Sequence, residues 1–205
     1  MERGELSELG NVMLAPYIEK ATALIGVPRQ IGGNQFRHMM ATLAILIDYK
    51  IVDPVMLKAA VIHDLLEDVE GVDPELILQI DHDGKKVLEI VKELTRNKNE
   101  LKVSYLTRLR IEGSYEAKLV KLADRISNMT DLNADIFDYD FMCRYIKETE
   151  DLILPIAQEI NYDMFIELSD LVKSRRKIAE NLKQLHLVLD EFLNMHNLKD
   201  KVGNN

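Results

Sequence analysis

Four titratable residues stand close together in the segment AAVIHDLLEDVEG, which covers residues 59–71. They are His63, Asp64, Glu67 and Asp68. On a helix each residue advances by about 100°, so all four side chains fall on one side. The other side carries apolar residues at spacings of three and four, which is typical of a helix face that packs on a core. The sequence therefore predicts an acidic cluster beside the core.

Such a cluster is costly, because like charges repel and partial burial removes them from water. A bound cation would offset both effects, so this segment favours a metal site. An acidic surface loop that ends at Gly71 would explain the same residues without a metal.

The other histidines differ in their surroundings. His38 begins the apolar segment FRHMMATLAILIDY and is a candidate partner for His63. His82 repeats the His-Asp dipeptide, but a glycine and two lysines follow the pair, which indicates a turn. His186 and His196 lie in the last predicted helix without clustered carboxylates, and we expect structural or surface roles for both.

A third segment, AKLVKLADRISNMTDL at 117–132, has an apolar face with Asp124 at its edge. Asn128 stands one turn later on the same face. An ordinary helix-surface salt bridge of Asp124 with Lys121 or Arg125 is the alternative explanation.

Together, these segments supply two imidazoles and two carboxylates from three helices. The set His38, His63, Asp64 and Asp124 offers nitrogen and oxygen ligands without sulfur. Such ligands suit Mn²⁺, Fe²⁺ or Mg²⁺, and Zn²⁺ less well.

The elements that position these residues are predicted to be helices throughout, so the fold class is all-α. Asp53-Pro54 and Asp73-Pro74 each place an N-capping aspartate before a proline in the first turn. No alternating pattern predicts a strand. A loop, GVPRQIGGNQ, separates the first two helices. The expected helices are 6–25, 35–49, 54–67, a short one after Pro74, 84–95, 100–111, 115–132, 139–160 and 162–197.

The 205 residues suffice for one domain with a sizeable core. We expect that domain over 1–170 and a C-terminal helical extension over 171–205 that packs on it. The amphipathic pattern of the extension also suits a docking helix or a homodimer contact.

Composition excludes several classes of protein. The apolar runs are too short to cross a bilayer and the charged N-terminal segment has no signal core, so we expect a cytoplasmic protein without membrane contact. A net charge of −9 argues against nonspecific nucleic-acid binding. The single cysteine, Cys143, excludes an internal disulfide and a thiolate metal cage. Basic residues concentrated in two segments suit a small phosphate ligand instead. They are Arg29, Arg37, Arg96, Lys98, Lys102, Arg108 and Arg110.

A lone histidine, then HDLLED, then KLVKLADRISNM resembles the HD superfamily of metal-dependent phosphohydrolases. The closest resemblance is to the alarmone hydrolase domain of RelA/SpoT homologues, which carry HDxxED and a later KLADRLxNM-type helix. The segment RYIKETEDLILPIAQEI at 144–160 is similar to the family's ETLxIYxPIA segment. The likeness covers roughly residues 10–170.

This resemblance implies an HD-domain helical bundle with an additional C-terminal helix. It implies His38, His63, Asp64 and Asp124 as metal ligands, with Mn²⁺ as the expected ion. Glu67 and Asp68 would then orient and activate the attacking water, which a carboxylate can do by accepting a proton. The substrate contacts that the resemblance implies are Arg29, Asn128 and Arg144.

The implied activity is hydrolysis of the 3′ pyrophosphate of (p)ppGpp to GDP or GTP and pyrophosphate. The loop before His38 departs from the family's RKxxGxPYxxHP, because it reads RQIGGNQFRHMM and is shorter. Arg29 matches, whereas Gln30 replaces the lysine and Met39 replaces the final proline. The same metal chemistry on another nucleotide, or a catalytically silent alarmone-binding protein, are therefore the alternatives.

Overall fold

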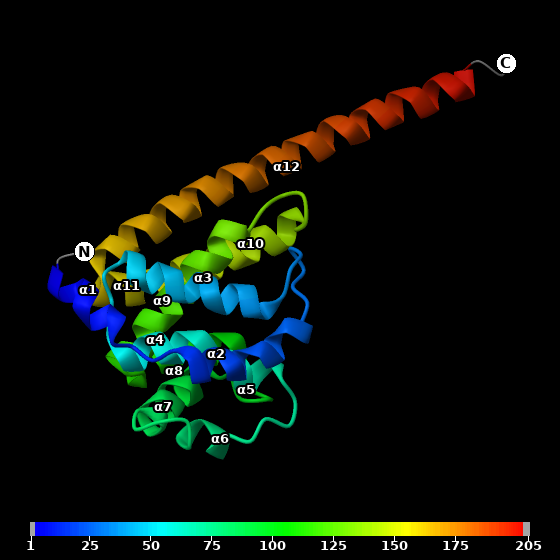
Figure 1. Cartoon of the computed structure of the whole chain (residues 1–205). Helices are drawn as coiled ribbons and strands as arrows, with labels where there is room; N and C mark the ends of the chain where they lie inside the picture. Colours follow the sequence, from blue (N-terminus) through cyan, green and yellow to red (C-terminus); the bar gives the residue numbers. More distant parts are fainter. Residues whose placement is uncertain (1–2, 203–205) are drawn as a thin grey trace.

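The computed structural model describes residues 3–202, and every regular element in this range is a helix (Figure 1). This confirms the predicted all-α class. The elements include a 3₁₀ turn, η1, and a π-helical turn, η2. In chain order they are α1 (Arg3–Gly10), α2 (Ala15–Ala21), η1 (Thr22–Gly26), α3 (Gln35–Asp48), α4 (Pro54–Ile62), α5 (Leu65–Asp68), α6 (Glu75–Leu78), α7 (Gly84–Leu94), α8 (Lys102–Glu112), α9 (Tyr115–Asp131), α10 (Tyr139–Glu148), η2 (Thr149–Ile153), α11 (Leu154–Ile160) and α12 (Tyr162–Val202).

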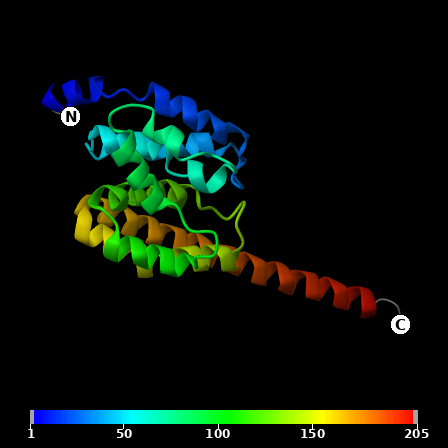
Figure 2. The same ribbon diagram turned by 90° about the horizontal axis from the view of Figure 1, so that it is seen from below.

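Helices α3 and α9 pack against each other at the centre of the bundle. Seen from below, the N-terminal helices lie on one side and the later helices, with α12, on the other (Figure 2). Met39 and Leu46 of α3 and Leu122 and Ile126 of α9 are buried in the shared core. A site at the α3–α9 contact therefore draws residues from both halves of the chain.

The helix predicted over 54–67 is wrong as one continuous element, because it is interrupted at His63 and Asp64. The Nδ1 atom of His63 hydrogen-bonds the carbonyl oxygen of Ala60 at 2.9 Å. In a continuous helix that carbonyl would accept the backbone N–H of Asp64. The side chain thus takes the place of a backbone bond, and α5 starts again at Leu65.

Two other predicted helices are also divided. The segment predicted over 6–25 becomes α1, α2 and η1, with a break between Gly10 and Ala15. Glycine at a helix end and proline in a first turn, here Pro16, are typical of such a break. The segment predicted over 139–160 follows one helical path but contains η2 just before Pro155. Proline lacks the N–H that a regular α-helical ladder needs at that position.

The last helix, α12, begins on the body of the protein and extends beyond it (Figure 1). Met164, Leu168, Val172 and Ala179 are buried, whereas the side chains of residues 183–194 are exposed. The predicted boundary between 170 and 171 lies inside this helix, and the division into a domain and an extension stays a prediction. No helix among the described residues is long and apolar enough to cross a membrane.

Candidate active site

The loop before α3 delivers two side chains to the site. Gly32 and Gly33 have φ values of 89° and 74°, which other residues adopt only with strain. Their turn lets the N–H of Gln35 bond the carbonyl of Val27 at 2.9 Å and closes the loop. Asn34 then caps α3 by accepting from the N–H of Arg37. Arg29 and Gln35 are thereby held on the side of His38.

His38, His63 and Asp124 come together as a buried group between α3, the end of α4 and α9. His38 Nε2 lies 2.8 Å from Asp124 Oδ1, and His63 Nε2 lies 3.9 Å from the same oxygen. The Nδ1 atom of His38 contacts the Ser127 hydroxyl at 3.1 Å. Both imidazoles are thus oriented by a second contact, as is usual for histidines that bind metals.

The residues of this group fit a cation. His63 Nε2 is buried and has no hydrogen-bond partner among the described residues, while carboxylates lie around it. Burial alone would lower the pKa of His63, but the nearby Asp64 and Asp124 carboxylates outweigh it and raise the pKa to about 9. The field at Nε2 therefore favours a positive charge, which a divalent ion supplies as well as a proton does.

Asp64 joins the group from the break between α4 and α5. Its carboxylate oxygens lie 3.4 Å from His63 Nε2 and 4.0 Å from His38 Nε2. The four residues predicted as ligands are therefore close in space. The ligand atoms of the three buried residues lie close enough together to hold a metal ion.

Asp124 also forms the salt bridge that the sequence offered as its alternative explanation. Lys121 Nζ lies 2.6 Å from Asp124 Oδ2, and the Lys121 side chain is only 15% exposed. Arg125 instead turns away, to Glu148 and Thr149. Burial would raise the pKa of Asp124, but Lys121 and the two histidines hold it well below its usual value. The carboxylate is thus kept ionised between a lysine and two imidazoles.

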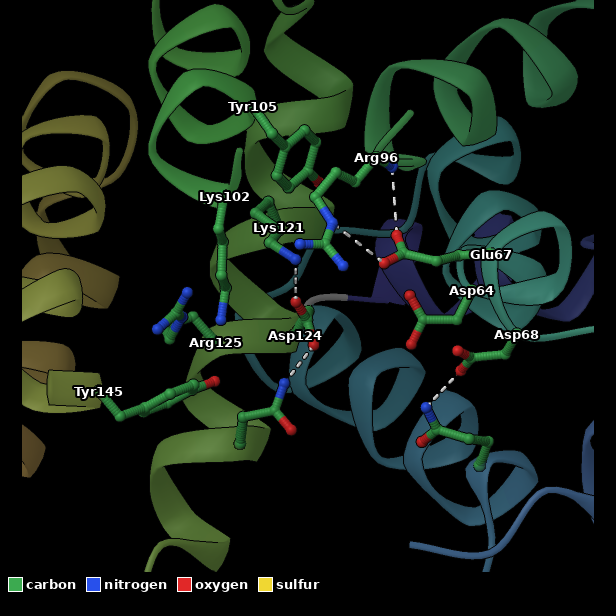
Figure 3. Close-up of a pocket in the computed structure, with 12 residues that line it drawn as sticks. Asp64, Glu67, Asp68, Arg96, Lys102, Tyr105, Lys121, Asp124, Arg125 and Tyr145 are labelled. Carbon is green, nitrogen blue, oxygen red and sulfur yellow. Dashed lines mark hydrogen bonds and ion pairs between the residues drawn. The ribbon is translucent and has the colours of Figure 1, made fainter. Parts of the chain in front are cut away.

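A charged cavity of about 300 Å³ opens beside this group (Figure 3). Acidic residues of α5 and basic residues of α8, α9 and the loop before α8 line it, and one of these cations, Arg96, pairs directly with Glu67 at 3.7 Å. Its lining residues are Gln35, Asp64, Glu67, Asp68, Arg96, Lys102, Tyr105, Lys121, Asp124, Arg125, Asn128 and Tyr145.

Glu67 and Asp68 are both held by neighbours. Glu67 Oε2 accepts the backbone N–H of Arg96 at 3.1 Å, and Asp68 Oδ2 accepts from the Gln35 amide. Burial and the nearby Asp64 raise the pKa of Asp68, which the Gln35 hydrogen bond only partly offsets. Asp68 consequently has a stronger affinity for a proton than an exposed aspartate has.

The basic side of the charged cavity combines exposed and buried cations. The side chains of Arg96 and Lys102 are 42% and 46% exposed, whereas that of Arg125 is 2% exposed. Arg125 donates to Glu148 at 2.6 Å and lies over the Tyr145 ring, 4.4 Å from its centroid. This side suits a ligand that carries several negative charges.

A second cavity of about 320 Å³, here called the aromatic cavity, adjoins the first and shares Gln35, Asp64 and Asn128 with it. Phe137 and Phe141 line it and stack at 4.7 Å between ring centroids. Its other lining residues are Pro28, Arg29, Gln30, Ile31 and His38.

Arg29 and Asn128, both predicted to contact substrate, touch each other. Arg29 Nη2 donates to Asn128 Oδ1 at 2.6 Å, and Asn128 Nδ2 donates to Asp124 Oδ1 at 2.6 Å. A second Arg29 nitrogen pairs with Asp131 at 3.1 Å. These bonds link the loop, α9 and the buried group.

Arg144 and His82 lie elsewhere. Arg144 is exposed on α10 and lines neither of these two cavities, so the geometry gives its predicted substrate contact no support. The His82 side chain is 87% exposed, and Lys58 already pairs with the neighbouring Asp83. His186 is exposed on α12, and the side chain of His196 lies outside the described residues.

Several residues of the site escaped the sequence analysis. Gln35, Tyr105 and Tyr145 were not singled out, and Lys121 and Arg125 were considered only as partners of Asp124. Arg96 and Lys102 belong to the basic segments from which a phosphate ligand was predicted. For Lys121 and Arg125 the sequence did hold a signal, because a lysine and an arginine one turn apart flank the candidate ligand Asp124.

No model of a protein family matches the chain. It is similar to guanosine-3′,5′-bis(diphosphate) 3′-pyrophosphohydrolase MESH1 of Homo sapiens, with 41% identity over 87 residues, 40% of this chain and 46% of the human protein. The Drosophila melanogaster MESH1 is 34% identical over 105 residues, 48% of this chain and 55% of the fly protein. The chain thus matches about half the length of these curated relatives.

The fold has a solved counterpart. A structure described as a metazoan ortholog of SpoT that hydrolyzes ppGpp superposes with a TM-score of 0.67 and 20% identity, covering 85% of this chain and 97% of that one. At this identity the match establishes the fold. Sequence over part of the chain and fold over most of it confirm the resemblance that the motifs predict: this chain is related to the MESH1-type HD-domain ppGpp 3′-pyrophosphohydrolases.

Proposed function

We propose that this chain is a metal-dependent phosphohydrolase that removes the 3′ pyrophosphate of (p)ppGpp and releases GDP or GTP and pyrophosphate. One observation carries the proposal. A buried group of two histidines and an aspartate borders a cavity that both carboxylates and cations line. The activity for which the MESH1 relatives are named supports the choice of nucleotide.

The proposed reaction is the hydrolysis of the bond between the ribose 3′ oxygen and the pyrophosphate group. Water adds to the phosphorus bonded to the ribose 3′ oxygen, the bond between that phosphorus and the 3′ oxygen breaks, and the 3′ oxygen leaves with a proton. A divalent ion held by His38, His63, Asp64 and Asp124, with Mn²⁺ as our candidate, would polarise the phosphoryl oxygens and acidify water. No oxidant or reductant is required.

Glu67 and Asp68 orient the attacking water and accept its proton. Asp68 has a raised pKa and lies in the cavity wall, so it is our candidate acceptor for the proton of the attacking water. Glu67, fixed by the Arg96 N–H, orients the same water from the adjacent position on α5.

The basic residues bind the pyrophosphate group, which is transferred to water when the 3′ oxygen leaves. Arg96 and Lys102 are partly exposed at the cavity, and Arg125 is fixed behind them. Pyrophosphate offers only acceptor oxygens and carries several negative charges, so these donors stabilise it both before and after cleavage.

The nucleoside then extends into the aromatic cavity. Phe137 and Phe141 offer apolar surface for a base, and Arg29 and Asn128 lie where the two cavities approach each other. We assign Arg29 and Asn128 to substrate contacts on this basis. The changed loop around Arg29 favours one rival, the same chemistry on another phosphorylated nucleotide.

A hydrolysis screen tests the function. The purified protein with Mn²⁺ is incubated with ppGpp, pppGpp, nucleoside triphosphates, deoxynucleotides and cyclic nucleotides, and products are separated by ion exchange. We expect GDP, or GTP, together with pyrophosphate from the alarmones. Metal-dependent cleavage of another nucleotide alone would replace the substrate assignment, and alarmone binding without cleavage would favour a silent binding protein.

Metal content tests the ligand set independently of turnover. We expect about one divalent ion per chain by elemental analysis and its loss in His63→Ala and in Asp124→Ala. His82→Ala, in the other His-Asp pair, is the matched control and should keep the ion. Full occupancy in both ligand variants would rule out the assigned site.

A further inference from the structure

Gln35 connects three parts of the proposed active site, namely the glycine loop, the two cavities and Asp68. It is the first residue of α3 and follows the glycine turn of the loop. It lines both the charged and the aromatic cavity. Its amide nitrogen Nε2 donates to Asp68 Oδ2. An ionised carboxylate only accepts hydrogen bonds, so this contact fixes which end of the amide faces Asp68.

The other end of the amide is unsatisfied. Gln35 Oε1 is buried, and no group among residues 3–202 donates to it. A buried acceptor without a donor destabilises the folded chain, and native proteins retain few of them. An apolar side chain of the same length would avoid that cost. Stability therefore does not explain a glutamine at this position.

The contact with Asp68 gives a functional explanation. With Oδ2 bound to Gln35, the carboxylate plane is fixed, and Oδ1 receives no hydrogen bond from the described residues. A neutral amide is suited to this task, because a lysine or arginine would form an ion pair and lower the proton affinity of the carboxylate much further.

We propose that Gln35 is a positioning residue of the hydrolysis: its amide nitrogen holds Asp68 by Oδ2 so that Oδ1 faces the attacking water. The inference rests on the proposed function of Asp68 as proton acceptor. Gln35 acts through Asp68 and does not itself touch the reacting atoms. Small errors in the placement of a base cost large factors in rate, so its loss should be visible in kcat.

The test compares Gln35→Met with the wild-type protein. Methionine keeps the length of the side chain but cannot donate to Asp68. We expect kcat for ppGpp to fall about tenfold or more, with KM within about twofold and metal content unchanged. The melting temperature should equal or exceed that of the wild type, because the unpaired Oε1 is gone. Gln79→Met, at an exposed glutamine after α6, is the control and should change none of these quantities.

A double-variant cycle shows whether Gln35 works through Asp68. If it does, Gln35→Met should lower kcat little or not at all in an Asp68→Asn background. Independent, multiplicative losses would overturn the proposal, and so would a lower melting temperature that accounts for the lost activity.

A generic phosphate ester distinguishes a failure of the substrate assignment from a failure of the role proposed for Gln35. If wild type cleaves p-nitrophenyl phosphate with Mn²⁺ but not ppGpp, the alarmone assignment fails, and the same cycle on p-nitrophenyl phosphate decides the role of Gln35. If neither compound is cleaved, both proposals fail.

Discussion

At the scale of single residues, the site pairs each acidic group with a different kind of neighbour. Asp124 lies between imidazoles and Lys121, so its pKa is held low and it stays an anion. Asp68 has only a neutral amide donor and lies near another carboxylate, so its pKa is raised. The first arrangement suits a ligand of a cation and the second suits a proton acceptor.

Because of this difference, substitutions in the acidic pair should lower turnover without loss of the metal. Glu67→Gln and Asp68→Asn keep the shape of the side chains but remove the charge that orients and deprotonates water. Each should lower kcat about 10²-fold or more while the metal content measured by elemental analysis stays at wild-type level. Glu70→Gln, on the exposed turn just after α5, is the control. Wild-type turnover in both variants would show that the acidic pair is only a surface feature.

At the scale of elements, a second polar network holds α4, the helix that ends at His63. Lys58 of α4 is 2% exposed, and its Nζ lies 2.7 Å from both Asp81 and Asp83. The Tyr17 hydroxyl of α2 donates to Asp81 at 2.7 Å. The buried Lys58 cation thus joins α2, α4 and the turn before α7. That turn contains the second His-Asp pair of the sequence.

Removal of that cation should destabilise the protein. Lys58→Met leaves two carboxylates without their partner, and we expect the free energy of unfolding in urea to fall by about 3 kcal/mol near neutral pH. Lys85→Met, at an exposed position of α7, should change it little. An equal effect of the two substitutions would mean that the network contributes no stability.

The stability difference between the wild-type protein and Lys58→Met should depend on pH. Burial would raise the pKa of Asp81, but Lys58 and Tyr17 outweigh it and lower the pKa below its usual value of about 3.8. A group with a lowered pKa in the folded state stabilises above its unfolded pKa and loses that effect as pH falls through the folded pKa. The stability difference between wild type and Lys58→Met should therefore shrink as pH falls below about 4.

At the scale of the whole molecule, α12 is both part of the core and a projection from it. Arg175 donates to the carbonyls of Met129 and Thr130, each at 2.7 Å, and so completes the last turn of α9. Val172 and Ala179 are buried against the body. The first half of α12 thus supports the helix that carries Asp124.

Two shortened chains test this division. A chain that ends at Asp190 should keep the melting temperature within about 2 °C of wild type, because the described side chains that it removes, those of residues 191–194, are exposed. A chain that ends at Asp170 loses the buried Val172 and Ala179 and the Arg175 bonds, and its melting temperature should fall by about 10 °C. Calorimetry measures both. An unchanged value for the shorter chain would show that residues 1–170 form a complete domain without the part of α12 that follows Asp170.

The sequence alone determined the helical class, most helix positions and the residues of the buried group. These follow from local rules: apolar spacing marks the packed face of each helix, and Asp53 with Pro54 marks the start of α4. Histidine and aspartate on such faces are rare enough to be informative, and His38, His63 and Asp124 do meet in the fold.

Only the tertiary structure decided how these residues are held. The break at His63 arises because its ring bonds the Ala60 carbonyl, which no spacing rule predicts. Gln35 and Arg96 reach the acidic pair from distant segments, and Lys121 is partly shielded from water only because α9 packs into the bundle. Periodicity reports which face of a helix is inside. The partner of each polar side chain on that face depends on the packing of several helices at once. This packing decides whether an aspartate such as Asp124 forms only a surface salt bridge or joins a buried group.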